Sequence, residues 1–145
     1  MQILIVDDEP TIAQFFTRLA HLRGHRDIDA AANGEEALGY VLRNTYDLIT
    51  VDIRMPGVSG LEIIGMLRNM NPHAVIAVVS GFLPDRVSEE VAGCVDLMVP
   101  KPVSVQTFLQ LLDGATLISE TMERLRLLGT SPEPVRLGIR NAAGS

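Results

Sequence analysis

The feature of this sequence that most limits its fold is the alternation of short apolar segments with amphipathic ones. Residues 3–6 are entirely apolar, and residues 48–51 and 75–79 form similar runs. Strands that read as continuous apolar runs are buried on both faces of a sheet. Residues 11–23 place apolar side chains at helical spacing and end at Gly24. Such alternation predicts a parallel sheet with helices on both faces.

The pattern contains five such units. Strands are predicted at residues 3–6, 27–31, 48–51, 75–79 and 95–99. Helices are predicted at about residues 11–23, 37–44, 61–70, 84–92 and 104–128, the fourth being short and polar. We therefore expect an α/β fold with a flavodoxin-like, doubly wound, five-stranded parallel sheet of strand order 2-1-3-4-5 and an elongated last helix.

Composition and charge exclude several classes of protein. A chain of 145 residues is enough for one domain. The net charge of −6 argues against direct nucleic-acid binding, for which a basic face supplies most of the affinity. No apolar run approaches the roughly 18 residues of a membrane span, and the N-terminus lacks the basic segment of a signal peptide. Cys94 is the only cysteine, which fits a reducing cytoplasm.

Polar side chains follow four of the five predicted strands. Asp7 and Asp8 follow the first strand, and Asp52 follows the third. Ser80 follows the fourth strand and Lys101 follows the fifth. Ligands of open α/β sheets bind outside the carboxyl ends of the strands, at the point where the strand order reverses. We therefore expect three carboxylates, a hydroxyl and an ammonium group to share one shallow cleft.

These groups suit phosphoryl transfer. Three neighbouring carboxylates repel one another, so at least one pKa would rise without a cation. Oxygen ligands suit Mg²⁺, which together with Lys101 would neutralise an incoming phosphoryl group. Ser80 could donate a hydrogen bond to one of its oxygens. Asp52, at the centre, is the expected nucleophile, and its product would be an aspartyl phosphate.

The segments IVDDEP, VDIRMPGVSGLE, VVSG and VPKP together resemble those of response-regulator receiver domains, in the same order and spacing. The resemblance covers residues 1 to about 115. It implies a phosphorelay module, not a turnover enzyme, that a histidine kinase or phosphotransfer protein phosphorylates. Phosphorylation then switches a protein–protein surface. Because no output domain follows, we expect a stand-alone domain that acts on a separate downstream effector protein.

The resemblance also assigns roles to individual residues. It implies that Asp52 is phosphorylated and that Asp8 and Asp52 bind Mg²⁺ directly. Asp7 would act through water, and the backbone carbonyl of Arg54 would complete the protein ligands. Arg54 and Phe82 lie where the family tunes hydrolysis, so we expect these two side chains to restrict the attacking water.

The remaining implied roles concern the phosphoryl contacts and the switch. Ser80 and Lys101 would contact the phosphoryl group, and the Lys101–Pro102 bond resembles the cis peptide of the family. Receiver domains commonly carry Tyr or Phe three positions before this lysine, where the chain has Met98. A flexible, apolar methionine could still repack, but how the switch works without an aromatic ring stays open.

The chain continues beyond the part that the resemblance covers. Apolar residues follow a 3-4 alternation at Phe108, Leu111, Ala115, Ile118, Met122 and Leu125. We expect a receiver domain at 1–115, an extension of the last helix at 116–128 and a disordered tail at 129–145. The extension is either a frayed surface helix or a contact for a homodimer. Complementary charges at the flanking positions are lacking, which disfavours a true coiled coil.

Other functions fit this sequence less well. An Mg²⁺-dependent phosphatase with an aspartyl nucleophile would place its two carboxylates two positions apart after the first strand, whereas Asp7 and Asp8 are adjacent. Neither phosphate-binding glycine motif of nucleotide-binding proteins occurs. A pseudo-receiver that is never phosphorylated, and serves as a scaffold or dimerisation module, remains an alternative because of Met98.

Overall fold

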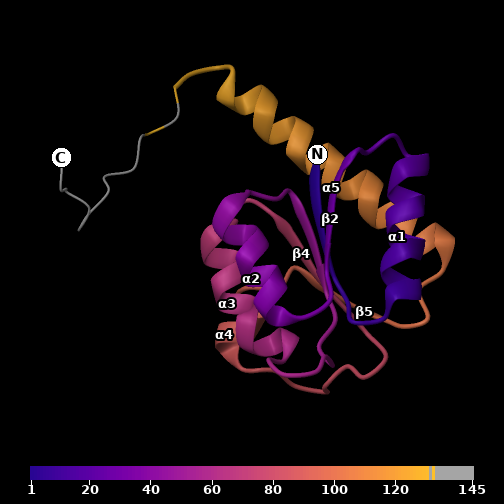
Figure 1. Cartoon of the computed structure of the whole chain (residues 1–145). Coiled ribbons are helices and arrows are strands. Elements are labelled where there is room, and N and C mark those ends of the chain that lie inside the picture. Colours follow the sequence, from indigo (N-terminus) through magenta and orange to yellow (C-terminus); the bar gives the residue numbers. More distant parts are fainter. Residues whose placement is uncertain (131, 133–145) are drawn as a thin grey trace.

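A five-stranded parallel sheet of order β2-β1-β3-β4-β5 forms the centre of the protein, and helices cover both of its faces (Figure 1). The computed structural model describes residues 1–130 and residue 132. The strands are β1 (Gln2–Val6), β2 (Asp27–Ala31), β3 (Leu48–Val51), β4 (Val75–Ser80) and β5 (Leu97–Pro100). The helices are α1 (Pro10–Leu22), α2 (Gly34–Arg43), α3 (Gly60–Met70), α4 (Glu89–Ala92) and α5 (Val105–Arg126).

The predicted fold class and strand order are confirmed. Most of the predicted tail, residues 131 and 133–145, lies outside the described residues.

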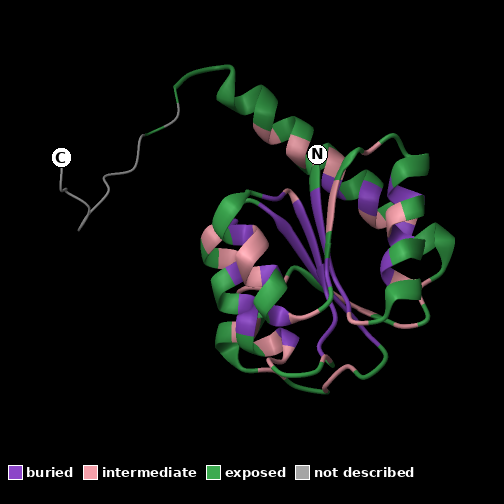
Figure 2. Ribbon diagram, viewed as in Figure 1, coloured by how far each residue is buried: buried purple, intermediate pink, exposed green. Residues whose placement is uncertain are grey.

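The core consists of two apolar layers, one on each side of the sheet. Leu4 and Val6 of β1 pack with α2 and α3, whereas Ile3 and Ile5 pack with α1 and α5. All four are at most 1% exposed, which explains why β1 reads as one continuous apolar run. Figure 2 shows the same arrangement, with buried residues on the strands and on the inner sides of the helices.

Two predicted boundaries between β4 and β5 differ from the structure. The helix predicted at 84–92 is only Glu89–Ala92. It begins there because the Ser88 hydroxyl accepts a hydrogen bond from the Val91 N–H, and no residue of α4 is buried to support a longer helix. The strand predicted at 95–99 begins at Leu97, because the Val95 N–H is still bonded to the carbonyl of Val91.

Only the first part of α5 packs on the sheet. Its buried residues are Phe108, Leu112 and Ala115. The helix continues to Arg126, two residues short of its predicted end, and projects beyond the sheet (Figures 1 and 2). Two residues of the predicted apolar alternation, Ile118 and Leu125, are therefore about half exposed, at 48% and 54%. None of the described helices combines the length and the apolar character needed to cross a bilayer.

Gly60 fixes the distance between α3 and the end of β3. A Cβ atom at Gly60 would collide with the backbone carbonyl oxygen of Asp52 and lie 2.9 Å from Cγ1 of Val51. The absence of a side chain at Gly60 therefore lets α3 begin directly against the residue that follows β3.

We expect Gly60→Ala to lower the free energy of unfolding by about 2 kcal/mol, since the buried backbone of Asp52 must shift. Gly65→Ala in the same helix is the matched control, because nothing lies within 4 Å of its added Cβ. It should be neutral or stabilising by up to about 1 kcal/mol. Urea denaturation of both variants measures the difference, and equal stability of the two would contradict this packing.

Candidate functional site

The carboxyl ends of four strands bring the predicted site residues together. Asp7 and Asp8 follow β1, and Asp52 follows β3. Ser80 ends β4, and Lys101 follows β5. Residues around a pocket of about 380 Å³ include Asp8, Glu9, Asp52, Arg54, Ser80, Phe82 and Lys101. Groups that are up to 94 positions apart in the sequence thus share one site.

Backbone hydrogen bonds hold the two buried aspartates in place. The Asp52 N–H donates to the Val6 carbonyl at 2.9 Å, which extends the pairing of β1 and β3 past the last strand residue. Each carboxylate also accepts a bond from the residue two positions later. The Glu9 N–H donates to Oδ1 of Asp7 at 2.9 Å, and the Arg54 N–H donates to Oδ1 of Asp52 at 3.2 Å. The strand ends therefore determine where these carboxylates point.

Lys101 joins the carboxylates of the two strands. Its Nζ lies 2.7 Å from Oδ2 of Asp7 and 3.1 Å from Oδ2 of Asp52. Oε1 of Glu9 is 3.6 Å away. The Lys101 N–H donates to the carbonyl of Ser80 at 3.0 Å, and the Lys101–Pro102 bond is cis, as the resemblance implied. The ammonium group is thus placed between the first and third strand ends.

Burial and the contact between Asp7 and Lys101 shift the pKa of both groups. Burial raises the pKa of Asp7, although the hydrogen bond from Lys101 and its charge favour the carboxylate. Burial on its own would lower the pKa of Lys101, but hydrogen bonds to Asp7 and Asp52 and their charges raise it overall. Lys101 is therefore charged, while Asp7 still bears a cost for ionising.

The three aspartates form a candidate metal centre. Asp7, Asp8 and Asp52 each offer one carboxylate oxygen, and these oxygens lie within 4.8 Å of one another. Carboxylate oxygens are the ligands that hard divalent cations such as Mg²⁺ and Ca²⁺ prefer. The donor set and the excess of negative charge therefore fit a divalent cation.

The other predicted residues lie at the rim of the pocket or outside it. The Ser80 hydroxyl is buried and accepts a bond from the Phe82 N–H at 3.3 Å. The Arg54 guanidinium stacks on the Phe82 ring, 4.3 Å from its centroid. Met98 lies away from the pocket, in register with Val78 and against the core layer of α2 and α3.

Sequence reasoning missed two residues that shape the site. Glu9 borders the pocket, donates its N–H to Asp7 and lies beside Lys101. Its position two residues after Asp7, the spacing of an Asx turn, was the available signal. Gly60 allows the close approach of α3 to Asp52, and its place directly after the capping residue Ser59 carried no indication of that contact.

Comparisons with known proteins agree with this geometry. Residues 3–113 match the sequence profile of the response regulator receiver domain. The chain is 32% identical over 112 residues to response regulator MprA of Mycobacterium sp. (strain KMS), a match that covers 75% of this chain and 47% of that protein. The chain thus spans about half the length of this relative.

Two solved structures are similar over most of the chain. Response regulator TrrA from Thermotoga maritima, in complex with Mg(2+)-BeF, has a TM-score of 0.67 at 35% identity and covers 81% of this chain and 99% of its own. A response regulator from Burkholderia pseudomallei, with a phosphorylated aspartic acid, a calcium ion and citrate, has a TM-score of 0.69 at 26% identity. That match covers 91% of this chain and 76% of the other. Sequence match and fold together place this chain in the family of response regulator receiver domains, which are signalling modules and not turnover enzymes.

Proposed function

We propose that Asp52 accepts a phosphoryl group from a phosphohistidine of a histidine kinase or phosphotransfer protein. The observation that carries this proposal is the placement of the buried Asp52 carboxylate, 3.1 Å from the Lys101 ammonium group and within the cluster of three aspartates. The pocket around it is open to an incoming donor and is lined by Ser80 and Arg54. Residues 1–115 would form this phosphoacceptor unit.

The reaction requires one bond to form and one to break. A carboxylate oxygen of Asp52 attacks phosphorus, the bond from phosphorus to the histidine nitrogen breaks, and that nitrogen keeps the electron pair. Lys101 offsets the charge on the phosphoryl oxygens, and Ser80 donates a hydrogen bond to one of them. Arg54 and Phe82, stacked at the rim, would restrict the water that hydrolyses the product.

We assign Mg²⁺ as the cation of the acidic cluster. Asp8 and Asp52 would bind it directly, Asp7 through water, and the backbone carbonyl of Arg54 would complete the protein ligands. The support is the set of three carboxylate oxygens within 4.8 Å of one another, beside the one ammonium group of Lys101. When bound, the ion supplies positive charge to the transferring phosphoryl group.

The proposal extends to the partners of the domain. Phosphorylation would change a surface that a downstream effector protein recognises, in the cytoplasm, where Cys94 stays a free thiol. The change would not use an aromatic ring at the position of Met98.

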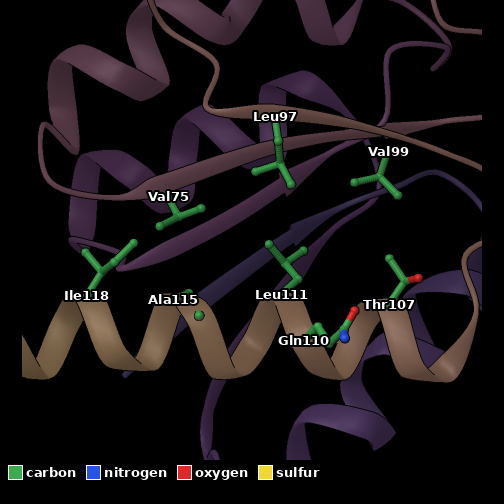
Figure 3. Close-up of a pocket in the computed structure, with 9 residues that line it drawn as sticks. Val75, Leu97, Val99, Thr107, Gln110, Leu111, Ala115 and Ile118 are labelled. Atoms are coloured by element: carbon green, nitrogen blue, oxygen red, sulfur yellow. The ribbon is translucent and has the colours of Figure 1, made fainter.

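We further propose that a second copy of the chain docks on α5. The chain would then also act as a dimerisation module. One side of the helix carries only uncharged residues over its outer turns, namely Leu111, Gly114, Ile118, Thr121, Met122 and Leu125. Figure 3 shows that Leu111 and Ile118 face Val75 and Leu97 across an apolar groove of about 340 Å³. The same uncharged side of a second α5 offers a matching surface, as a two-fold contact requires.

Phosphorylation is tested by incubating the chain with Mg²⁺ and acetyl phosphate and measuring its intact mass. We expect the mass of one added phosphoryl group on the parent and none on Asp52→Asn. Asp113→Asn is the control, because Asp113 lies on the surface in an ion pair with Arg23. An unmodified parent would reject the proposal and favour a pseudo-receiver.

The cost of burying the Asp7 carboxylate is tested through stability in Mg²⁺-free buffer. Because burial raises the folded-state pKa of Asp7, the protein is most stable with respect to this group below the ordinary value of 3.8, and that stability is lost as pH rises through the folded-state pKa. Above that pKa we expect Asp7→Asn to raise the free energy of unfolding, because the amide carries no charge to desolvate and Lys101 keeps its contact with Asp52. Urea titration measures it, and destabilisation by Asp7→Asn would show that the pair with Lys101 outweighs the burial of charge.

The contact between copies is tested by light scattering at increasing protein concentration. The average mass of the parent should rise towards that of a dimer, whereas Ile118→Lys should stay monomeric because it places a charge in the groove. Leu117→Lys is the matched control, since Leu117 is 63% exposed and does not line the groove. A parent that is monomeric at every concentration would remove the dimer proposal.

A further inference from the structure

Gly34 begins α2 and lacks a side chain for a steric reason. Its φ lies outside the left-handed region, so its backbone does not require glycine. A Cβ atom at Gly34 would lie 3.2 Å from Cβ of Val58 and 3.4 Å from both the Val58 carbonyl oxygen and Cγ2 of Ile63. The first turn of α2 therefore rests directly on the segment between β3 and α3, residues 53–59, which we call the β3–α3 loop.

The β3–α3 loop forms one wall of the candidate metal centre. Its second residue, Arg54, donates its N–H to Oδ1 of Asp52 at 3.2 Å. A pocket of about 440 Å³ lies between Asp8 and the loop, and residues 53–56 and Ser59 line it. The position of the loop thus sets how far Asp8 lies from the backbone of Arg54, whose carbonyl is a proposed ligand of the cation.

The helices on either side of this contact are anchored at their first turns. At the start of α2, Oδ1 of Asn33 accepts a hydrogen bond from the Glu36 N–H at 2.8 Å, and Oε1 of Glu36 accepts one from the Ala32 N–H at 2.7 Å. At the start of α3, the Gly60 N–H donates to the Ile53 carbonyl at 3.1 Å. Because both helix starts are fixed, crowding between them would displace the loop.

The middle of the loop has few restraints of its own. Among the described residues, the N–H groups of residues 55–59 make no hydrogen bond to another backbone group. Met55 and Val58 pack against the core layer of α2 and α3, and the Ser59 hydroxyl donates to the Ile53 carbonyl at 3.2 Å. The packing of Val58 beside α2 is therefore one of the few contacts that hold the loop in place.

We infer that Gly34 and Val58 are positioning residues of the metal centre. The first turn of α2 supports the loop at Val58 and so fixes the backbone of Arg54 relative to Asp8 and Asp52. Mg²⁺ demands near-ideal octahedral geometry, so a loop displaced by a few tenths of an ångström binds it less well. This inference rests on the proposed Mg²⁺ site and adds to it a support from a helix that contributes no ligand.

Mg²⁺ titration, followed by the amide chemical shifts of isotope-labelled protein, tests this support without any phosphodonor. We expect Gly34→Ala to raise the dissociation constant for Mg²⁺ about tenfold, the lower end of the cost of disturbing groups that orient metal ligands. Gly39→Ala is the matched control, because it makes the same change in the same helix and its added Cβ would meet only the flexible end of Arg43, at 3.9 Å. It should bind Mg²⁺ as the parent does.

A double-mutant cycle shows whether the effect passes through Val58. Val58→Gly removes the Cβ atom that an alanine at position 34 would crowd, although the freer loop should weaken Mg²⁺ binding somewhat by itself. In the Val58→Gly background, Gly34→Ala should change the dissociation constant by less than about twofold. A general effect on the stability of α2 would instead appear equally in both backgrounds.

The possible results separate this inference from the Mg²⁺ site itself. A parent that binds Mg²⁺ and a Gly34→Ala variant that binds it equally well would overturn the support and leave the ion in place. Equal weakening by Gly39→Ala, or the same loss in the Val58→Gly background, would also overturn it. A parent whose amide shifts do not respond to Mg²⁺ would overturn both the proposed ion and its support.

Discussion

The structure depends above all on the balance of charge where β1, β3 and β5 end. One ammonium group, from Lys101, lies 2.7 Å from Asp7 and 3.1 Å from Asp52, while Asp8 adds a third carboxylate to the cluster. The cluster thus places three carboxylates beside one ammonium group, and burial raises the pKa of Asp7. Such a site favours a cation, which carboxylate oxygens can bind. It also favours an electrophilic phosphoryl group, which a carboxylate oxygen can attack.

The fold that creates this balance could be predicted because its signals are local and redundant. Each central strand is buried on both faces, so residues such as Ile3 to Val6 form uninterrupted apolar runs. The rule that ligands bind at the carboxyl ends of parallel strands then predicts from the sequence that Asp7, Asp52 and Lys101 lie together. The structure brings Lys101 within hydrogen-bonding distance of both Asp7 and Asp52.

The parts that could not be predicted depend on contacts between segments that lack a regular pattern. The length of α4 is set by the Ser88 cap and by the absence of buried residues, which polar residues 84–92 do not reveal. The apolar alternation of α5 did not single out Leu112, which is fully buried against the sheet. The stacking of Arg54 on Phe82 joins two loops that follow different strands, so neither residue signals the other in the sequence.

The most direct test of the account locates the modified residue. Borohydride reduces an aspartyl phosphate to homoserine, so reduction after treatment with Mg²⁺ and acetyl phosphate marks the acceptor, and peptide mass spectrometry finds it. We predict homoserine at position 52 and at no other aspartate. Homoserine at Asp7 or Asp8, or none at all in a sample whose intact mass has increased, would contradict the central claim that the Asp52 carboxylate is the phosphoacceptor.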